Sequence, residues 1–127
     1  MGAHYDGPLH SPSADDNASG LAASLELAKR WRAQPPHRPD APWPIGSNGR
    51  YVKTKVLPVP NRGAAIPDVR ISDHSPFWDQ GYNTLMVTDT SYMRNPHYHQ
   101  MSDTVDTLDL PFFCQVVNGL DAALSRL

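Results

Sequence analysis

The chain has 127 residues, of which 39% are hydrophobic, and a formal net charge of -2 from 11 basic and 13 acidic side chains. This composition supports one modest core and gives no basic surface for nucleic acid or anionic lipid, so we expect a single domain, 1–127, without either partner. No apolar run reaches the roughly 18 residues of a membrane-spanning helix, and no export signal is visible, which predicts a soluble chain of unknown compartment. Cys114 is the only cysteine and excludes an internal disulfide.

The first predicted element after the N-terminus is a helix. Residues 1–20 are rich in Gly, Pro, Ser and Asp, which favour turns over regular structure. From Leu21 onward, apolar residues recur with a period of 3.6, and cations cluster near Arg30, where they oppose the helix dipole. We therefore expect a metal-binding loop and a helix in 1–33, with the helix over about 18–32.

A proline-rich linker is expected next, at 34–50, because five prolines between Pro35 and Pro44 prevent a helix or central strand. Tyr51–Leu57 alternates as a strand does, and Thr84–Thr88, TLMVT, suits a buried strand. Helices alternating with short apolar strands predict an α/β fold.

The C-terminal stretch predicts an amphipathic helix with Asp109 as its cap and Pro111 in its first turn. Cys114 adjoins the apolar face of this helix and is expected to be a buried thiol. That face comprises Phe113, Val116, Val117, Leu120, Leu124 and Leu127.

Two N-terminal motifs carry groups that bind metals: GAHYD at 2–6 and SADDNASG at 13–20. A His and an Asp can both ligate zinc, and Asp6 could accept the other ring N–H of His4 and fix its tautomer. Asp15 and Asp16 stand together at a helix start, where like charges repel unless a cation or the helix N-terminus holds them. The alternative is that both simply cap the helix.

Two later motifs are SDHSPFWD at 72–79 and NPHYHQMSDTVDTLD at 95–109. His97 and His99 are two residues apart, so they can share one side of an extended segment but not of a helix. Only one of them needs to be a ligand, and the alternative is that both are ordinary polar residues.

Together these motifs resemble the di-zinc aminopeptidases of metallopeptidase clan MH, family twenty-eight. The resemblance covers about 1–32 and 51–127. It implies a partial zinc-aminopeptidase-like (phosphorylase/hydrolase-like) three-layer sandwich, with a mixed, mostly parallel sheet. It also implies hydrolysis of N-terminal peptide bonds, with zinc as cofactor and a peptide as substrate. The site residues it implies are the metal ligands His4, Asp15 (bridging both zincs) and His99, Asp6 behind His4, and Asp73, His74, Phe77 and Trp78 near the substrate pocket.

The sequence departs from this family in its acidic residues. The family uses one Glu as general base and another as a ligand of the second zinc, and a later Asp completes the first zinc. Here Glu26 is the only Glu and lies inside the first helix, while the linker stands where those acids are expected. We therefore expect a chain truncated at the N-terminus and deleted internally, with impaired or no catalysis and one zinc or none.

Three alternatives stay open beside this interpretation. The first is an active aminopeptidase in which another carboxylate replaces the missing Glu. The second is a non-catalytic metal-binding or protein-interaction module, and the third is a glutaminyl-cyclase-like enzyme. Self-association is expected through sheet edges that missing strands leave uncovered.

Overall fold

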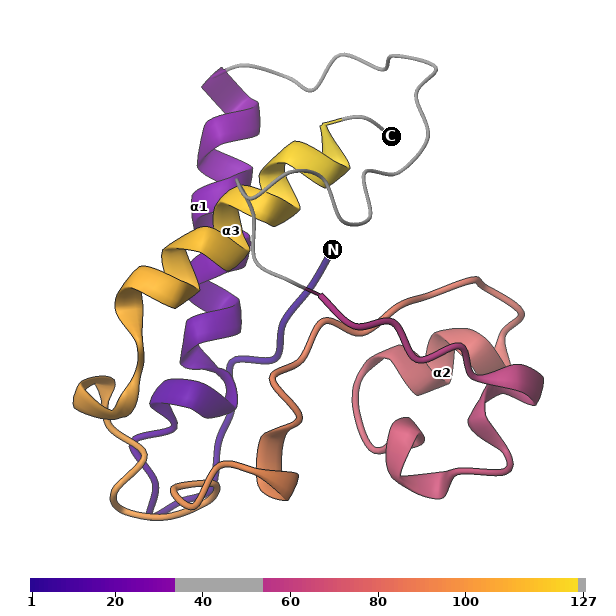
Figure 1. Ribbon diagram of the computed structural model, residues 1–127, viewed down its shortest axis with the longest axis horizontal. Coiled ribbons are helices and arrows are strands. Elements are labelled where there is room, and N and C mark those ends of the chain that lie inside the picture. Colours follow the sequence, from indigo (N-terminus) through magenta and orange to yellow (C-terminus); the bar gives the residue numbers. More distant parts are fainter. Residues whose placement is uncertain (34–53, 126–127) are drawn as a thin grey trace. The chain divides into compact units, whose positions relative to one another are not determined.

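The computed structural model describes residues 1–33 and 54–125, and these fall into two compact units (Figure 1). Unit 1 comprises the described residues of Met1–Thr54 and Pro96–Leu127, and unit 2 comprises Lys55–Asn95. The expected linker at 34–50 lies outside the described residues, and the prediction of one peptidase-like domain stays a prediction.

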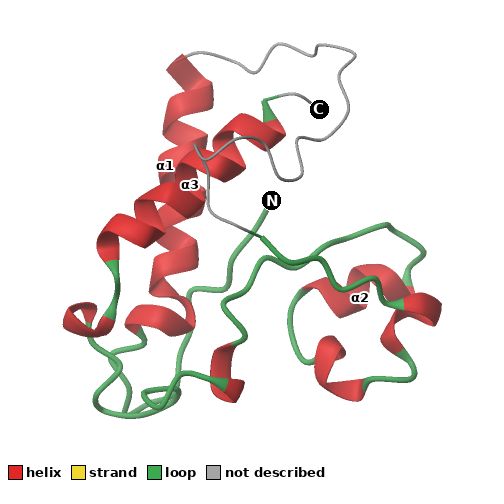
Figure 2. Cartoon of the chain, in the orientation of Figure 1, coloured by secondary structure: helices red, strands yellow, loops and turns green. Residues whose placement is uncertain are grey.

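The predicted α/β sandwich is wrong for the part of the chain that the structure describes. Figure 2 shows helices and loops there and no strand. The predicted strand at Thr84–Thr88 is a loop in which Leu85 is 65% exposed and Val87 54% exposed. A strand forms only when another backbone supplies its hydrogen bonds, and an apolar run alone does not provide that partner. Of the other predicted strand, residues 51–53 lie outside the described residues and 54–57 are loop.

Regular structure in the described residues consists of α-helices joined by short helical turns. The α-helices are α1 (Ser19–Ala33), α2 (His74–Asp79) and α3 (Leu110–Leu124). One π-helical turn, η1 (Ala14–Ala18), precedes α1, and the 3-10 turns are η2 (Pro60–Gly63), η3 (Pro67–Arg70), η4 (Ser91–Met93) and η5 (Val105–Thr107). No helix within these ranges has the length and apolar character needed to cross a membrane.

The core of unit 1 lies between α1 and α3, which confirms both predicted helices (Figure 1). Leu27 of α1 is fully buried, and Ala23 and Val117 pack with it. Trp31, Phe113 and Leu120 cover this cluster partly. The apolar face expected on α3 supplies Phe113, Val117 and Leu120 to this cluster. On α1 the buried face is a different one from the stripe that begins at Leu21, because Leu25 is 63% exposed.

The start of α3 also agrees with its sequence signals. A side-chain oxygen of Asp109 accepts the N–H of Phe112 at 2.9 Å, as an N-cap does. Cys114, however, is exposed, so the predicted buried thiol is wrong: it is next to the buried stripe in sequence but outside it on the helix. Leu127 lies outside the described residues.

Polar contacts join the C-terminal half of α1 to the C-terminal half of α3. Arg30 bonds Glu26 at 2.9 Å, Asn118 at 3.0 Å and Asp121 at 3.3 Å, and the Trp31 indole donates to Asp121 at 2.9 Å. The hydrogen bond from Arg30 lowers the pKa of the Glu26 carboxyl, and the bonds to Glu26 and Asp121 raise the pKa of the guanidinium. This network fixes the register of α1 against α3.

Unit 2 is built around the short helix α2. The Trp78 indole donates to the Thr84 carbonyl at 3.1 Å, and the Thr84 hydroxyl donates to the His74 carbonyl at 3.3 Å. Arg70 forms an ion pair with Asp79 at 2.6 Å. These contacts tie the loop that follows α2 back to the helix.

Candidate functional site

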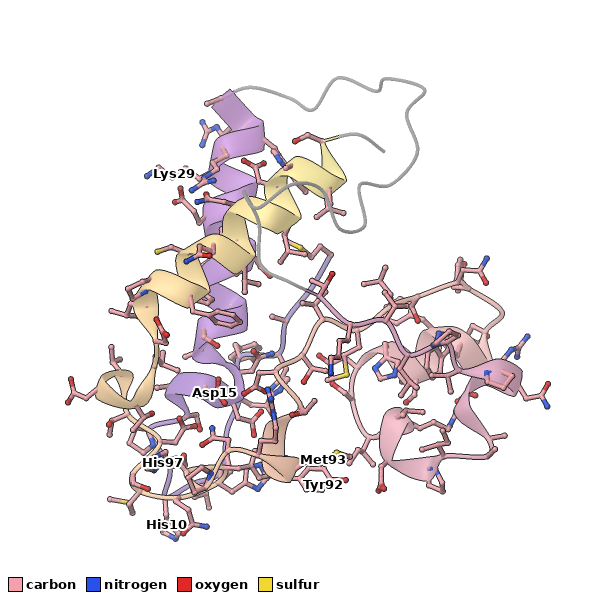
Figure 3. The ribbon with its side chains drawn as sticks, viewed as in Figure 1. His10, Asp15, Lys29, Tyr92, Met93 and His97 are labelled. Carbon is pink, nitrogen blue, oxygen red and sulfur yellow. The ribbon has the colours of Figure 1, made fainter. Side chains whose placement is uncertain are left out.

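The N-terminal entry to α1 presents the Asp16 carboxylate in unit 1. Within η1, the backbone of Asp16 (φ -113°, ψ 82°) and Asn17 (φ -139°, ψ 36°) leaves the helical region. The side-chain directions of Asp15 and Asp16 therefore do not follow helical geometry, although both residues precede the same helix. Figure 3 labels Asp15 at this end of α1, opposite the end that carries Lys29.

Two imidazoles approach the Asp16 carboxylate, one at each oxygen. His99 Nε2 lies 2.9 Å from Oδ2, and His4 Nε2 lies 3.4 Å from Oδ1. The Asp16 side chain is 19% exposed, against 30% for His4 and 47% for His99. We call these three residues the His–Asp cluster. It brings together the GAHYD loop, the SADDNASG loop and the late His motif, although 95 positions of sequence separate His4 from His99.

The other ring nitrogen of His4 faces Asp6. His4 Nδ1 lies 3.0 Å from the Asp6 carbonyl oxygen and 3.2 Å from its carboxylate Oδ1. Both of these atoms are acceptors, so Nδ1 carries the proton. Nε2 of the same ring lies 3.4 Å from Asp16 Oδ1, so a cation between these two atoms would be bound by both.

His99 is held by its own neighbour. The ring stacks on Tyr98, with centroids 3.9 Å apart and planes inclined by 16°. Its backbone is left-handed, with φ 58°, a conformation that few residues other than glycine adopt. The local chain thus turns sharply at the residue that contacts Asp16.

Asp103 is fully buried and binds the backbone next to the cluster. Its Oδ1 accepts the N–H of Asp15 at 2.9 Å, and its Oδ2 accepts the N–H of Asp16 at 3.3 Å. The Ala14 N–H donates to the Asp103 carbonyl at 3.1 Å. One buried residue therefore binds three successive amides of the loop that carries Asp16.

The donor chemistry of the cluster suits zinc, but its present arrangement does not. Two imidazoles and a carboxylate are ordinary zinc ligands, at about 2.0–2.2 Å from the metal. In residues 1–33 and 54–125, however, no three His, Cys, Asp or Glu side chains are placed so that they could hold a metal ion. The Asp16 carboxylate contacts both imidazoles, so binding a metal between the three groups requires those contacts to open.

The sequence-based site residues are thus placed as follows in unit 1. The structure brings His4, Asp6 and His99 together, and the carboxylate that contacts both imidazoles is that of Asp16. The amide of Asp15 is bound by Asp103. Whether Asp15 ligates a metal stays a prediction.

Sequence reasoning did not assign roles to Asp16 or Asp103, although both lie inside the quoted motifs. The DD pair offered two equivalent carboxylates, and no periodicity distinguishes them across a backbone that leaves the helix. Asp103 follows His99 by four residues and carried no signal of burial, because Asp is seldom fully buried.

The residues expected at a substrate pocket lie in unit 2. His74 is buried, and its ring meets Trp78 edge-on with centroids 4.4 Å apart. Its Nε2 donates to the Val69 carbonyl at 2.7 Å, while Nδ1 is buried without a hydrogen-bond partner. Phe77 lines a shallow apolar hollow of about 210 Å³ with Pro76, Gln80 and Tyr82. The pocket role of Asp73, His74, Phe77 and Trp78 stays a prediction.

Comparison with known proteins finds likeness over part of the chain. The family model for peptidase family M28 matches residues 1–41. The uncharacterized protein YfbL of Escherichia coli (strain K12) is 38% identical over 60 residues, which are 47% of this chain and 19% of that protein. The matched region is therefore about a fifth of the relative's length. No solved structure matches significantly.

The family match contains both the GAHYD and the SADDNASG loops, which supply His4, Asp6 and Asp16 to the cluster. The resemblance inferred from the motifs is thereby confirmed: this chain resembles peptidase family M28.

Proposed function

We propose that this chain is a peptidase-related domain that binds one zinc ion, weakly, at His4, Asp16 and His99, and does not itself hydrolyse peptides. The observation that carries the proposal is the Asp16 carboxylate with an imidazole Nε2 at each oxygen, 2.9 and 3.4 Å away. His4 supports it further, because its Nδ1 lies against the Asp6 acceptors while its Nε2 faces the Asp16 carboxylate.

Weak binding follows from the contacts that a metal would have to replace. The His–Asp cluster is closed by contacts at hydrogen-bond distance, so part of the zinc-binding free energy is spent on opening it. When bound, zinc would supply Lewis acidity and an activated water. Three protein ligands are sufficient for a single zinc with water in the fourth position.

The absence of turnover is proposed from the acidic residues of this chain. The resemblance calls for a Glu as general base, and the only Glu in the sequence is Glu26. Glu26 lies in the middle of α1 and pairs at 2.9 Å with Arg30, which is nearer the end of the helix remote from Asp16. Its carboxylate is engaged in a structural ion pair and is not aimed at the cluster.

Zinc stoichiometry by elemental analysis, with zinc titration calorimetry and hydrolysis of a leucyl chromogenic substrate, tests the proposal on the full chain. We expect one zinc per chain, bound weakly, and no hydrolysis above background. His4→Ala should weaken binding by more than about tenfold. His10→Ala, which removes an exposed imidazole from the same segment, should leave it unchanged.

Asp16→Asn and Asp15→Asn form a matched pair, because each removes one carboxylate charge at the same loop. Loss of zinc only in Asp16→Asn supports the cluster as the ligand set. Loss only in Asp15→Asn would instead support the assignment made from the motifs. Two zincs with hydrolysis that depends on the DD pair would refute the proposal and favour an active aminopeptidase.

The expected zinc also separates this proposal from a protein-interaction module. Such a module needs no metal, so a purified chain without stoichiometric zinc, and with unchanged behaviour after His4→Ala, would favour it. A glutaminyl-cyclase-like enzyme would convert a glutaminyl peptide, which the same preparation can be assayed for.

A further inference from the structure

Asp103 is fully buried, unlike the other described acidic residues of unit 1, and its carboxylate accepts two backbone N–H groups. Burying a carboxylate is costly unless hydrogen bonds compensate for lost hydration. Here two amide N–H groups provide that compensation, and they belong to Asp15 and Asp16. The free energy of burial is therefore coupled to the conformation of the loop that bears the Asp16 carboxylate.

Asp103 also holds the segment that carries His99. Asp103 follows His99 by four residues, and hydrogen bonds close the intervening chain: the Gln100 N–H donates to the His97 carbonyl at 2.9 Å, and the Asp103 N–H donates to the Gln100 carbonyl at 3.1 Å. The segment that carries His99 is thus anchored to the DD loop at Asp103. This short, hydrogen-bonded connection limits how far His99 can lie from Asp16.

We propose that Asp103 is the positioning residue of the His–Asp cluster: by binding the amides of Asp15 and Asp16, it holds the Asp16 carboxylate between His4 and His99. This inference rests on the proposed zinc-binding role of the cluster. Asp103 does not touch the metal or a substrate in this scheme, and it acts only through the backbone of Asp16.

Three variants of the full chain test this role by zinc titration calorimetry. Asp103→Ala removes both acceptors, and Asp103→Asn keeps one carbonyl oxygen and replaces the other acceptor with an NH2 donor. Asp106→Asn removes the same charge from an exposed position in the same segment. We expect zinc affinity to fall by about 10- to 100-fold for Asp103→Ala, less for Asp103→Asn, and to stay within about twofold for Asp106→Asn.

A purely structural role is separated by reading the helix pair and the cluster independently. Circular dichroism reports α1 and α3, and the imidazole resonances of His99 and His4 report the cluster without metal. Asp103→Asn should shift the His99 resonance while helicity stays at the wild-type level. Equal zinc affinity and equal His99 resonances in Asp103→Asn and Asp106→Asn would overturn the inference while leaving the proposed function intact.

Hydrogen exchange on the wild-type chain keeps the test decisive if the Asp103 variants do not fold. The amides of Asp15 and Asp16 should be protected to the same degree as those of the η1–α1 junction, because a buried carboxylate binds them. Rapid exchange of both amides in a chain whose α1 is protected would overturn the inference. If wild-type chain binds no zinc, the proposed function fails, and the His99 resonance and these amides still decide the role of Asp103.

Discussion

At the scale of single residues, the functional reading depends on which atom of a side chain meets which partner. Both ring nitrogens of His4 have a partner: Nδ1 faces Asp6 and Nε2 faces Asp16. The Asp6 carbonyl alone suffices to fix the Nδ1 proton, and the exposed Asp6 carboxylate adds little, because solvent screens it. The tautomer of His4 is therefore set mainly by the fold of the GAHYD loop.

Arg30 and Glu26 supply the residue-scale prediction, because their hydrogen bond lowers the pKa of Glu26 below its ordinary value of 4.5. A depressed carboxyl pKa means that the ion pair stabilises the folded chain above about pH 4.5 and ceases to do so as pH falls through the folded pKa. We expect Glu26→Gln to lower the melting temperature near neutral pH, with the difference from wild type closing in acid.

Thermal unfolding of both proteins across this pH range measures the difference. High salt should reduce it, because both side chains are exposed and about 1 M salt screens such pairs. A difference that persists unchanged in acid and in salt would show that packing of the side chain, and not its charge, is responsible.

At the scale of elements, α1 and α3 stabilise unit 1 by burying one narrow stripe each, and the cluster lies beyond the N-terminal end of α1. The core and the cluster therefore involve different residues of the same helical segment. Removing core volume should lower the free energy of unfolding without changing the ligand atoms themselves.

Leu27→Ala is the element-scale prediction, because Leu27 is fully buried between the helices. Truncating such a side chain costs the lost transfer free energy plus that of the cavity, about 2–5 kcal/mol. Leu25→Ala makes the same change at a residue of α1 that is 63% exposed and should cost far less. Urea unfolding followed by circular dichroism compares the two. Equal losses would indicate that the α1–α3 contact does not form in solution.

At the scale of the whole molecule, the described residues leave many large apolar side chains exposed, among them Leu85, Met86 and Val87. Exposed apolar surface of this kind favours association. Residues 1–33 and 54–125 contain no strand, so our prediction of association for that part of the chain is based on apolar side chains and not on sheet edges.

We predict that the chain self-associates as its concentration rises, and that the double variant Leu85→Lys and Val87→Lys does so less. Sedimentation velocity over a range of concentrations measures this. A matched variant, Lys55→Ala and Arg94→Ala, changes two charges of the same unit in the opposite sense and should not reduce association. A single monomeric species at every concentration would contradict the prediction.

The sequence was informative where local pattern decides structure and uninformative where distant partners do. The 3.6 period located α1 and α3, because a helix forms its hydrogen bonds within one segment. The pattern at 84–88 predicted a strand wrongly, because strand pairing depends on another segment. The resemblance singled out His4 and His99, and the structure places both beside the Asp16 carboxylate. Which of the adjacent Asp15 and Asp16 carboxylates meets them depends on backbone angles and on buried Asp103, and the motifs do not give these.

The hydrogen bond from the Asp15 amide to Asp103 spans 88 positions of sequence. Closing so long a loop has an entropic cost that grows only with the logarithm of its length, about 0.6 kcal/mol for each doubling. Insertions and deletions in the intervening chain therefore alter the free energy of this closure very little. The chain between Asp16 and His99 can therefore change greatly in length while the cluster still forms. Inserting or deleting one residue next to Asp103, in contrast, would move its carboxylate away from the Asp15 and Asp16 amides.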